Sequence, residues 1–436
     1  MNRPSSWQGD RAIAGISTDT RSLKKNQVFF ALSGNRFDGH RFVDIAFERG
    51  ALFCVVQEEF LSAGNTEARP LMVVDNTLTA LQQLAAIHRQ KFNIPLLALT
   101  GSNGKTSTKE MVAHILGGKY RVLKTEGNLN NHIGCPLTLL NLNEHHQAAV
   151  IELGSNHPGE IGLLADISQP NMALITNIGR VHMAYFKSLQ EVAEEKLSLF
   201  ERVKKEGTIY QNLDDPMVSA YRLQSGVKRV TYALNRDADL RGKIRHVNVF
   251  GQALLEINGY RIELQVPGIH MAQNAVAASA VAFSMGFTLP EIAEALHDFR
   301  ASRQRMEISE RDGLRIINDA YNANPVSMKA AFTTISNMKP AGRIFLVLGD
   351  MLELGEKSAQ WHGQVLREAL DMNPEAIVLL GDQMRRAAEQ ESSPKIIPCR
   401  SHQEAASRLK EMLKQGDLLL LKGSRGIAVE KILDYL

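Results

Sequence analysis

Features that would assign this chain to a specialised class of protein are scarce in its sequence. Only three cysteines occur in 436 residues, Cys54, Cys135 and Cys399, and they lie far apart without the spacing of metal ligands. This cysteine usage fits a reducing cytoplasm. No apolar run approaches the roughly 18 residues of a membrane span, and the N-terminal MNRPSSWQGD lacks the apolar stretch of a secretory signal. The formal net charge is only +3, with Lys and Arg scattered, so nothing indicates nucleic acid or a membrane surface as a partner.

Apolar segments separated by helical patterns divide the chain into three α/β units. A chain of 436 residues is too long for one compact core. In the first unit, VFFAL, LFCVV and LMVVD predict short buried strands, and Thr79 to Lys91 predicts a helix. We expect a small α/β domain over residues 1–91, a central domain over 92–304 and a C-terminal domain over 305–436.

The central and C-terminal units alternate strand and helix, which is typical of a mostly parallel sheet covered on both faces. In the central unit, IPLLALT, AAVIELG and MALITNIG predict buried strands. A period-two alternation over 228–266, with a turn signal at Asn258 and Gly259, predicts a small antiparallel annex. The alanine-rich stretch from Met271 to Met285 predicts a packed helix. In the third unit, LRIINDAY, RIFLVLGDM, AIVLLGD and DLLLLKGSRG predict a doubly wound, Rossmann-like sheet.

The clearest chemical signal is TGSNGKT, which lies between an apolar strand and a helix. Its glycines let backbone amides approach phosphate oxygens, and the start of the helix adds a favourable dipole. Lys105 would reach the terminal phosphates, and the Thr106 hydroxyl would ligate Mg²⁺. The outer glycine of a full Walker A motif would fall at Leu99, so the match is partial, and a purely structural turn is the alternative. The residues expected to bind a nucleotide here are Gly101, Ser102, Asn103, Gly104, Lys105, Thr106 and Ser107.

Two polar residues follow buried strands of the central unit. Glu152 ends the strand in IELG, and His182 follows the strand in MALITNIG. Residues just beyond the carboxyl ends of parallel strands converge on the ligand crevice, where a carboxylate and an imidazole could ligate Mg²⁺ or Mn²⁺. The alternatives are a helix cap or ion pair for Glu152 and a solvated loop side chain for His182.

A lysine occupies the apolar stripe of the helix that SLQEVAEEKLSLF predicts. Helical geometry places Lys196 in the middle of that stripe, with Glu191, Glu194 and Glu195 toward the outer side. A lysine on an apolar face extends its ammonium to the surface or loses its charge. A neutral amine can take up CO₂ and become an anionic carbamate ligand, but the spacing alone favours extension to the surface.

Taken together, these segments resemble the Mur ligase family over essentially the whole chain. STDTR and the following FFALSGNRFDGHRFVDIAFERGA are similar to the UDP-binding N-terminal domain of that family. TGSNGKT, NLNNHIGCP, IELG, the His182 segment and the EEK that ends at Lys196 resemble its ATPase domain. GIHMAQNAVAASA and SRQRMEI resemble its passage into the C-terminal domain. Many motifs in the correct order are more specific than any one of them.

The resemblance implies a role for each matching residue of the central unit. Lys105 and Thr106 would bind the phosphates and Mg²⁺. Glu152 and His182 would be metal ligands, with two metal sites expected, and Lys196 would carry a carbamate that supports the metal. The family thus reverses the preference drawn from spacing for Lys196. The residues that it implies in catalysis are Lys105, His182, Lys196 and Arg305, and those at the metal are Thr106, Glu152, His182 and Lys196.

Contacts to nucleotide and substrate are also implied by the resemblance. Asn274 would contact adenine, Arg305 the terminal phosphate of ATP, and Asp319 the ribose. A helix cap is the alternative for Asn274. The motifs that match a UDP-sugar site contain Ser17, Asp19, Arg21, Asp38 and His40, and a simple turn at Asp38 is the alternative there.

The third unit resembles one branch of the family, the one that joins D-alanyl-D-alanine to UDP-N-acetylmuramoyl-tripeptide. The matching segments are NDAYNANPVSM, LGDMLELG and LKGSRG. A DNPR-type motif, typical of the sister ligase that adds the third peptide residue, does not occur. For LGDMLELG, a turn with a helix start explains the residues as well as substrate contact does. The candidate partners of the dipeptide or nucleotide are Asn322, Asn324, Lys422 and Arg425.

The activity implied is an ATP-dependent amide ligation through an acyl phosphate, carried out by a cytoplasmic monomer that is open without ligands and closes around them. Within the same class, the alternatives are another Mur-type ligase and an enzyme similar to folylpolyglutamate synthase. From other classes, a P-loop ATPase or GTPase that drives a partner and a non-catalytic nucleotide-binding scaffold stay open. The metal candidates Glu152, His182 and Lys196 fit a switch protein poorly, and a scaffold leaves the placement of Lys196 without purpose.

Overall fold

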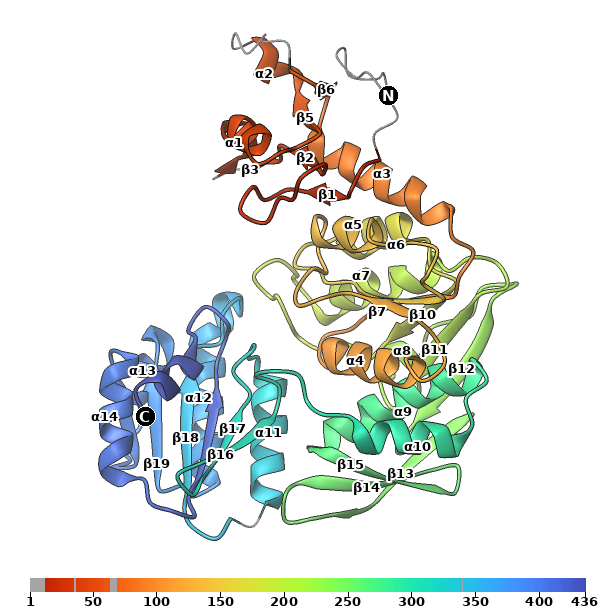
Figure 1. Cartoon of the computed structure of the whole chain (residues 1–436). Helices are drawn as coiled ribbons and strands as arrows, with labels where there is room; N and C mark the ends of the chain where they lie inside the picture. Colours follow the sequence, from red (N-terminus) through yellow and green to blue (C-terminus); the bar gives the residue numbers. More distant parts are fainter. Residues whose placement is uncertain (1–11, 35–36, 63–68, 339) are drawn as a thin grey trace.

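The chain folds into three α/β domains that follow one another along the sequence (Figure 1). The structure, a computed structural model, describes residues 12–34, 37–62, 69–338 and 340–436. The segment MNRPSSWQGD and residues 35–36 of the expected UDP-sugar motif lie outside these residues. The N-terminal domain stands above the central domain, and the C-terminal domain lies beside the central one. The α/β architecture predicted from the sequence is therefore confirmed.

The N-terminal domain contains a parallel sheet of four strands in the order β1-β2-β5-β6. The VFF of β2 is buried throughout, as expected of a strand covered on both faces. Helix α3 begins after Asn76, whose side chain accepts a hydrogen bond from the Thr79 amide, so it starts slightly earlier than predicted. The elements of this domain are β1 (Ile16–Ser17), β2 (Val28–Phe30), β3 (Ser33–Gly34), β4 (Phe37–Asp38), η1 (Gly39–Phe42), α1 (Val43–Glu48), β5 (Phe53–Gln57), α2 (Glu58–Ser62), β6 (Leu71–Val74) and α3 (Thr77–Gln90).

The central domain is built on a sheet of nine strands in the order β15-β14-β13-β12-β11-β10-β7-β9-β8. Strand β7 pairs in parallel with β10 on one side and with β9 on the other, so the strand order reverses around it. A ligand crevice is expected at the carboxyl end of such a strand. The strands are β7 (Leu96–Thr100), β8 (Val122–Lys124), β9 (Ala148–Glu152), β10 (Met172–Ile175), β11 (Thr208–Asn212), β12 (Lys228–Ala233), β13 (Leu240–Val247), β14 (Gln252–Ile257) and β15 (Tyr260–Pro267).

Helices cover both faces of this sheet. Alternate residues of β7 point to opposite sides: Leu97 and Leu99 pack in the core that contains α4 and α9, whereas Leu96 and Ala98 pack against the helices of the other face. The alanine-rich α9 is buried along most of its length, which confirms the predicted packed helix. The helices are α4 (Lys105–Leu116), α5 (Gly134–Leu139), α6 (Glu160–Ser168), α7 (Leu189–Glu201), α8 (Pro216–Ser219), α9 (Ile269–Ser284) and α10 (Leu289–Asp298).

The antiparallel annex is smaller than the sequence predicted. The hairpin of β14 and β15 around Asn258 and Gly259 is confirmed, and β13 pairs antiparallel with β14. Strand β12, however, pairs in parallel with β11 and with the start of β13. The prediction of an antiparallel segment from residue 228 was therefore wrong, because a period-two alternation reports burial of one face and not the direction of the neighbouring strand.

The C-terminal domain has a sheet of six strands in the order β16-β17-β21-β18-β19-β20. Only β16 and β17 pair antiparallel, and the remaining pairs are parallel, as in a Rossmann-like sheet. None of the described helices in the chain is long and apolar enough to cross a membrane. The elements are β16 (Glu307–Arg311), β17 (Leu314–Asn318), α11 (Pro325–Asn337), β18 (Ile344–Gly349), η2 (Gly355–Lys357), α12 (Ser358–Asp371), β19 (Ala376–Leu380), α13 (Asp382–Ala388), β20 (Ile396–Cys399), α14 (His402–Met412), β21 (Leu418–Lys422) and η3 (Val429–Asp434).

Candidate functional site

The segment between β7 and α4 forms a tight loop that requires both of its glycines. Gly101 and Gly104 have φ values of 149° and 81°, where any other residue is strained. A Cβ on Gly101 would lie 1.9 Å from Thr176 Oγ1, and one on Gly104 would lie 2.5 Å from Asn274 Oδ1. Helix α4 begins directly after Gly104, so its first amides have no acceptor within the helix. A positive helix end with free backbone donors is suited to a phosphate group.

Residues that follow β10 hold this loop in place. The Ser102 amide donates to Asn177 O at 2.9 Å, and the Asn103 amide donates to Asn177 Oδ1 at 3.0 Å. Ser102 Oγ donates to Gly179 O at 3.0 Å, and Thr176 Oγ1 donates to Asn103 O at 2.6 Å. Thr176, Asn177 and Gly179 were not predicted as supporting residues from the sequence. The polar end of the strand next to β7 was the available signal, since parallel strand ends meet at one edge.

Two cations from different domains converge on the loop. Lys105 Nζ donates to Gly101 O at 2.7 Å, so a carbonyl of the loop holds the lysine beside it. Arg305, at the start of the C-terminal domain, donates from Nη2 to Thr106 Oγ1 at 2.9 Å. Its guanidinium lies over the Tyr321 ring, 3.9 Å from the centroid. The structure thus brings together the predicted Lys105, Thr106 and Arg305.

Glu152 presents a buried carboxylate at the end of β9, next to the loop. Its side chain is almost fully buried, Oε1 accepts from Asn130 Nδ2 at 2.8 Å, and Lys109 Nζ lies 4.0 Å from Oε2. Among the described residues, no donor forms a hydrogen bond to Glu152 Oε2. Burial lowers the pKa of Lys105, the Glu152 charge opposes this shift, and Arg305 adds to it. A buried carboxylate oxygen without a donor is costly, and a cation would relieve that cost.

Lys196 remains inside the protein, so the expectation from spacing that it extends to the surface was wrong. Its side chain is 2% exposed, and within the described ranges no hydrogen bond or ion pair reaches its ammonium. Burial is the main cause that lowers its pKa to about 7, the positive Lys105 adds to the shift, and Glu195 opposes it. Glu195 was predicted on the outer side of the helix and is instead buried, because it accepts from the Gly159 and Ile161 amides at the start of α6.

His182 lies in the loop after β10 and contacts the C-terminal domain. Its Nδ1 is 2.5 Å from Glu353 Oε2, and both residues adopt positive φ, 52° and 63°. Burial lowers the pKa of His182, Glu353 opposes the shift, and the positive Lys105 and Lys196 add to it. The two lysines and the imidazole therefore share one electrostatic environment. Glu353 belongs to LGDMLELG, which the sequence left open as a possible substrate contact.

Of the four predicted metal ligands, only Glu152 and His182 have side chains that commonly bind metal ions in proteins. Across the described part of the chain, no group of three or more His, Cys, Asp or Glu side chains is arranged to hold one. The set Thr106, Glu152, His182 and Lys196 would become a cation site only if Lys196 carried an anionic carbamate or if phosphate oxygens completed it.

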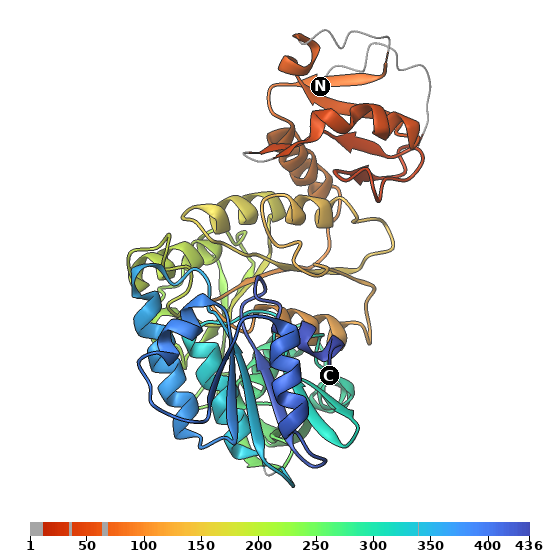
Figure 2. The same ribbon diagram turned by 90° about the vertical axis from the view of Figure 1, so that its left-hand side faces the viewer.

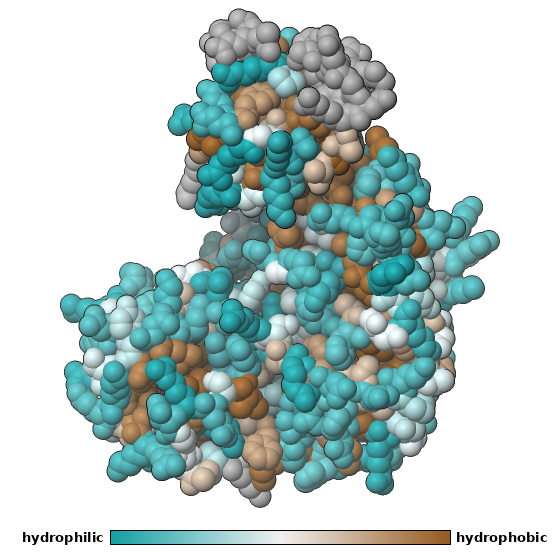
Figure 3. Space-filling model, viewed as in Figure 1, coloured by the Kyte–Doolittle hydropathy of each residue, from teal (hydrophilic) through white to brown (hydrophobic). Residues whose placement is uncertain are grey.

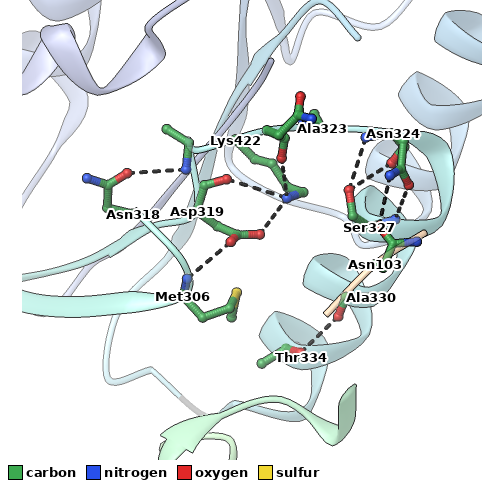
Figure 4. A network of polar contacts seen from close by, with 12 residues as sticks. Asn103, Met306, Asn318, Asp319, Ala323, Asn324, Ser327, Ala330, Thr334 and Lys422 are labelled. Carbon is green, nitrogen blue, oxygen red and sulfur yellow. Dashed lines mark hydrogen bonds and ion pairs between the residues drawn. The ribbon is translucent and has the colours of Figure 1, made fainter. Parts of the chain in front are cut away.

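A second polar cluster lies in the C-terminal domain (Figure 4). Lys422 Nζ is 2.5 Å from Asp319 Oδ2 and donates to Asn322 O at 3.2 Å. Asp319 Oδ1 accepts from the Met306 amide at 3.1 Å. The Lys422 side chain is almost fully buried, so its charge is already matched within the domain. Asp319, predicted at the ribose, and Lys422, predicted at the dipeptide or nucleotide, are thus partners of each other.

The remaining C-terminal candidates differ in their surroundings. Asn324 caps α11, accepting from the Ser327 amide at 2.9 Å, and also donates from Nδ2 to Asn103 Oδ1 in the phosphate loop at 2.8 Å (Figure 4). Arg425 is exposed and donates to Gln304 Oε1 at 2.5 Å. Asn324 therefore reaches the site beside the loop, whereas Arg425 forms a surface contact.

The five candidates for a UDP-sugar site bond to one another in the N-terminal domain. Arg21 Nη2 lies 2.7 Å from Asp19 Oδ2, and the Asp19 amide donates to Ser17 Oγ at 3.2 Å. Asp38 Oδ1 lies 2.8 Å from His40 Nδ1. In the part of the chain that the structure describes, none of these bonds reaches the phosphate loop, and Figure 2 shows the domain standing away from the other two. The surface in Figure 3 is hollowed between the N-terminal and C-terminal domains.

Known proteins match the chain from end to end. Residues 12–89 match the family model described as Mur ligase family, catalytic domain, residues 99–282 match the Mur ligase middle domain, and residues 304–425 match the Mur ligase, glutamate ligase domain. The UDP-N-acetylmuramoyl-tripeptide–D-alanyl-D-alanine ligase of Bacillus subtilis (strain 168) is 37% identical, covering 96% of this chain and 92% of that protein. The protein of the same name from Escherichia coli (strain K12) is 34% identical over 97% and 93%. The crystal structure of MurF from Acinetobacter baumannii superposes with a TM-score of 0.87 at 30% identity, covering 97% and 93%.

Proposed function

The chain belongs to the Mur ligase family, and we propose that it joins D-alanyl-D-alanine to UDP-N-acetylmuramoyl-tripeptide at the expense of ATP. The products are UDP-N-acetylmuramoyl-pentapeptide, ADP and phosphate. The names of the Bacillus and Escherichia relatives support this substrate pair, as do the three segments of the third unit that resemble this branch. The enzyme acts as a monomer in the cytoplasm, in the synthesis of peptidoglycan precursors. Its domains comprise residues 1–91, 92–304 and 305–436.

One contact carries the proposal, the hydrogen bond from Arg305 to Thr106. It joins the C-terminal domain to the end of the loop that is suited to phosphate. A reaction between a triphosphate and a carboxylate brings anions together, so cations must converge on the transferred group. Lys105 and Arg305 supply them from two domains. A switch ATPase can also receive an arginine from a second domain, so it is the match to Mur ligases along the chain that favours a ligase over that alternative.

The chemistry consists of two balanced steps. The terminal carboxylate of the tripeptide attacks the γ-phosphorus of ATP, which forms an acyl phosphate and releases ADP. The uncharged amine of the dipeptide then attacks the acyl carbon, the tetrahedral intermediate expels phosphate, and the amine gives up one proton. Lys105 and Arg305 stabilise the charge that develops on the transferred group. The domains exclude water, which would otherwise hydrolyse the acyl phosphate.

The central domain offers a set of groups for Mg²⁺. Glu152 Oε2, which accepts no hydrogen bond among the described residues, and the unpaired Lys196 fit a cation, provided that Lys196 reacts with CO₂ to give a carbamate. A lysine with a pKa of about 7 is partly uncharged at neutral pH, which this reaction requires. Glu353 holds one ring nitrogen of His182 and leaves the other for a ligand. Bound Mg²⁺ would neutralise phosphate charge, and Thr106 would hold it together with these groups.

Binding of the UDP-sugar and of the nucleotide is divided among the three domains. The UDP-sugar occupies the N-terminal domain at the motifs with Ser17, Asp19, Arg21, Asp38 and His40. The adenine lies near Asn274, which packs against Gly104, and the ribose lies near Asp319. Asp19 pairs with Arg21, and Asp38 pairs with the mostly buried His40, so each pair lies together in its motif.

The proposal is tested by phosphate release from ATP with UDP-muramoyl-tripeptide, with and without D-Ala-D-Ala, at fixed Mg²⁺ and bicarbonate. Release that requires both substrates, with a UDP-pentapeptide product by mass, is the expected result. A second arm offers UDP-muramoyl-dipeptide with lysine or diaminopimelate. Activity only in that arm would assign the chain to the sister ligase. A rate of ATP hydrolysis that does not depend on any amine or carboxylate substrate would overturn the ligase proposal.

The carbamate has its own test. Incubation with ¹³C-bicarbonate is expected to give a carbamate carbon signal in the NMR spectrum of the wild type. Lys196→Arg keeps a positive charge that cannot form the carbamate, so this variant is expected to lack the signal and most of the activity. A wild type whose activity is unchanged in CO₂-free buffer, and which gives no signal, would contradict the carbamate.

A further inference from the structure

The helix that follows the phosphate loop contains a lysine that is completely buried. Lys109 lies on α4, four residues after Lys105, and its side chain has no exposed surface. Residues four apart lie on the same face of a helix, so Lys109 is one turn further along the face of Lys105. A buried ammonium is costly unless it is paired. The partners of Lys109 therefore indicate what it does.

Two acceptors bind the Lys109 ammonium directly. Its Nζ donates to Thr125 O at 2.5 Å and lies 2.8 Å from Glu110 Oε1. The other carboxylate oxygen of Glu110, Oε2, accepts from Lys124 Nζ at 2.6 Å. One carboxylate is thus shared by two lysines, and it can neutralise only one of their two positive charges.

The second carboxylate beside Lys109 is that of Glu152, the proposed ligand of Mg²⁺. Lys109 Nζ lies 4.0 Å from Glu152 Oε2, which is too far for a hydrogen bond but close enough for strong attraction in a buried site. Glu152 Oε2 accepts no hydrogen bond from any described residue, so its lone pairs stay available for a cation. The charge of Glu152 also acts on Lys105, but that lysine is assigned to the phosphates. Lys109 is therefore the cation that can stay with Glu152 when ATP binds.

Thr125 connects Lys109 to Glu152 by a second route. Its backbone O accepts from Lys109, and its Oγ1 accepts from the Glu152 amide at 2.9 Å. Asn130 Nδ2 donates to Glu152 Oε1 at 2.8 Å, which fixes the other carboxylate oxygen. The helix that begins at the phosphate loop is thus tied, through Lys109 and Thr125, to the strand end that presents Glu152.

We infer that Lys109 is a positioning residue for the reaction. It balances the buried charge of Glu152, and it holds that carboxylate at a fixed place relative to the helix whose start is suited to phosphate. This role rests on the proposed function, because that function makes Glu152 a ligand of the Mg²⁺ that accompanies ATP. The alternative is that Lys109 only stabilises the fold through Glu110 and Thr125.

The test measures how strongly Mg²⁺ increases the affinity of the full-length protein for a non-hydrolysable ATP analogue. Calorimetry gives the Kd of the analogue in EDTA and in Mg²⁺, and the ratio of the two Kd values is the metal-dependent gain. Lys109→Met removes the charge from a side chain of similar length. It is expected to lower the gain about tenfold, as when a residue that orients a metal ligand is lost, and to leave the Kd in EDTA within about twofold. Turnover should need a higher Mg²⁺ concentration, with unchanged KM values for UDP-tripeptide and D-Ala-D-Ala, and Lys109→Arg should recover part of the gain.

Lys124→Met is the matched control, because Lys124 binds the same Glu110 carboxylate but forms no ion pair with Glu152 within the described ranges. It should keep the wild-type gain. An equal loss in Lys124→Met and Lys109→Met would show that pairing with Glu110 is responsible, and it would overturn the inference. An unchanged or larger gain in Lys109→Met would overturn it too, since Lys109 would then be neutral toward the cation or repel it.

The double variant Lys109→Met with Glu152→Gln keeps the test decisive if Lys109→Met alone does not fold, because it removes both buried charges. A residue that acts through Glu152 has no further effect once Glu152 is replaced, so the double variant should match Glu152→Gln. A further loss of the gain in the double variant would give Lys109 a separate role and overturn the inference. A Glu152→Gln variant that keeps the wild-type gain would instead refute the proposed role of Glu152 at the metal, so the two failures are distinguishable.

Discussion

The central domain meets its two neighbours through junctions of opposite character. At the phosphate loop its contacts with the C-terminal domain are polar, since Arg305 contacts Thr106 and Asn324 contacts Asn103. Away from the loop its junction with the N-terminal domain is built around an apolar cluster, where α3 packs on α5. The polar contacts at the phosphate loop involve residues predicted to bind ligands, whereas the apolar contacts between α3 and α5 attach the N-terminal domain to the central one. The comparison indicates that contacts between two domains shape the nucleotide side of the site, whereas the UDP-sugar motifs belong to a domain that is attached away from the phosphate loop.

The largest expected effect is on turnover at the polar junction. Arg305→Met removes a cation that contacts the loop and is expected to lower kcat roughly 10²–10³-fold, the usual cost of removing one donor that stabilises developing charge. The melting temperature should change little. Arg303→Met, at an exposed position two residues earlier, is the control and should keep wild-type kcat. A variant with unchanged kcat and only a raised KM for ATP would show that Arg305 contributes to binding and not specifically to the transition state.

A substitution in the apolar cluster between α3 and α5 should lower the free energy of unfolding and leave kcat unchanged. Leu81 is fully buried in a cluster that also includes Ile133 and Leu137 of the central domain. Leu81→Ala is expected to cost about 3 kcal/mol of unfolding free energy for the N-terminal transition in urea. At low temperature and saturating substrate, kcat should be retained. Ile87→Ala, at an exposed position of the same helix, should be close to neutral, and equal losses for the two variants would contradict the packing account.

A buried lysine near the polar junction should make stability depend on pH. The pKa of Lys196 is about 7 in the folded chain, and an unfolded lysine titrates near 10.4. Between these values the unfolded chain holds the extra proton, so stability should rise with pH, by about 3 kcal/mol from pH 7 to 10. Lys196→Met should remove that rise. Urea unfolding in CO₂-free buffer measures it, and parallel pH curves for the two proteins would rule out a depressed pKa.

The smallest expected effect comes from the second bond across the polar junction. Asn324→Asp keeps an oxygen that can accept from the Ser327 amide and cap α11, but it cannot donate to Asn103 Oδ1. The KM for ATP is expected to rise about threefold to tenfold, with the melting temperature retained. An unchanged KM would mean that this bond does not help to shape the loop for nucleotide.

The sequence predicted single residues of the site better than the distant residues to which they bond. The phosphate loop, Glu152 and His182 could be found because strand ends and glycines constrain them locally. The bond between Arg305 and Thr106 spans 199 residues, and that between His182 and Glu353 spans 171, so no local pattern could reveal them. Helical spacing placed Lys196 on the apolar stripe correctly, but it could not show whether neighbouring elements would close over the ammonium.

The same limit explains two other errors. Glu195 was expected outside its helix because spacing does not reveal that the start of α6 supplies two amides to it. Lys109 was not predicted as a buried residue, because it occupies an ordinary helix position, yet its side chain is fully buried and its Nζ donates to Thr125 O at 2.5 Å. In both cases backbone groups of another segment stabilise a buried charge, and Lys109 is also paired with the neighbouring Glu110 at 2.8 Å. The residues of the UDP-sugar motifs stay predictions, because their hydrogen bonds within the N-terminal domain do not show which of them contacts a ligand.

The most direct test traces an oxygen atom from the reacting carboxylate of the tripeptide to the released phosphate. UDP-muramoyl-tripeptide carrying ¹⁸O in the reacting carboxylate is turned over with ATP and D-Ala-D-Ala, and the released phosphate is analysed by mass. An acyl phosphate formed at the junction of the central and C-terminal domains requires one carboxylate oxygen to leave with each phosphate. The account predicts phosphate that contains one ¹⁸O atom per turnover of fully labelled substrate. Unlabelled phosphate released together with the pentapeptide would contradict it.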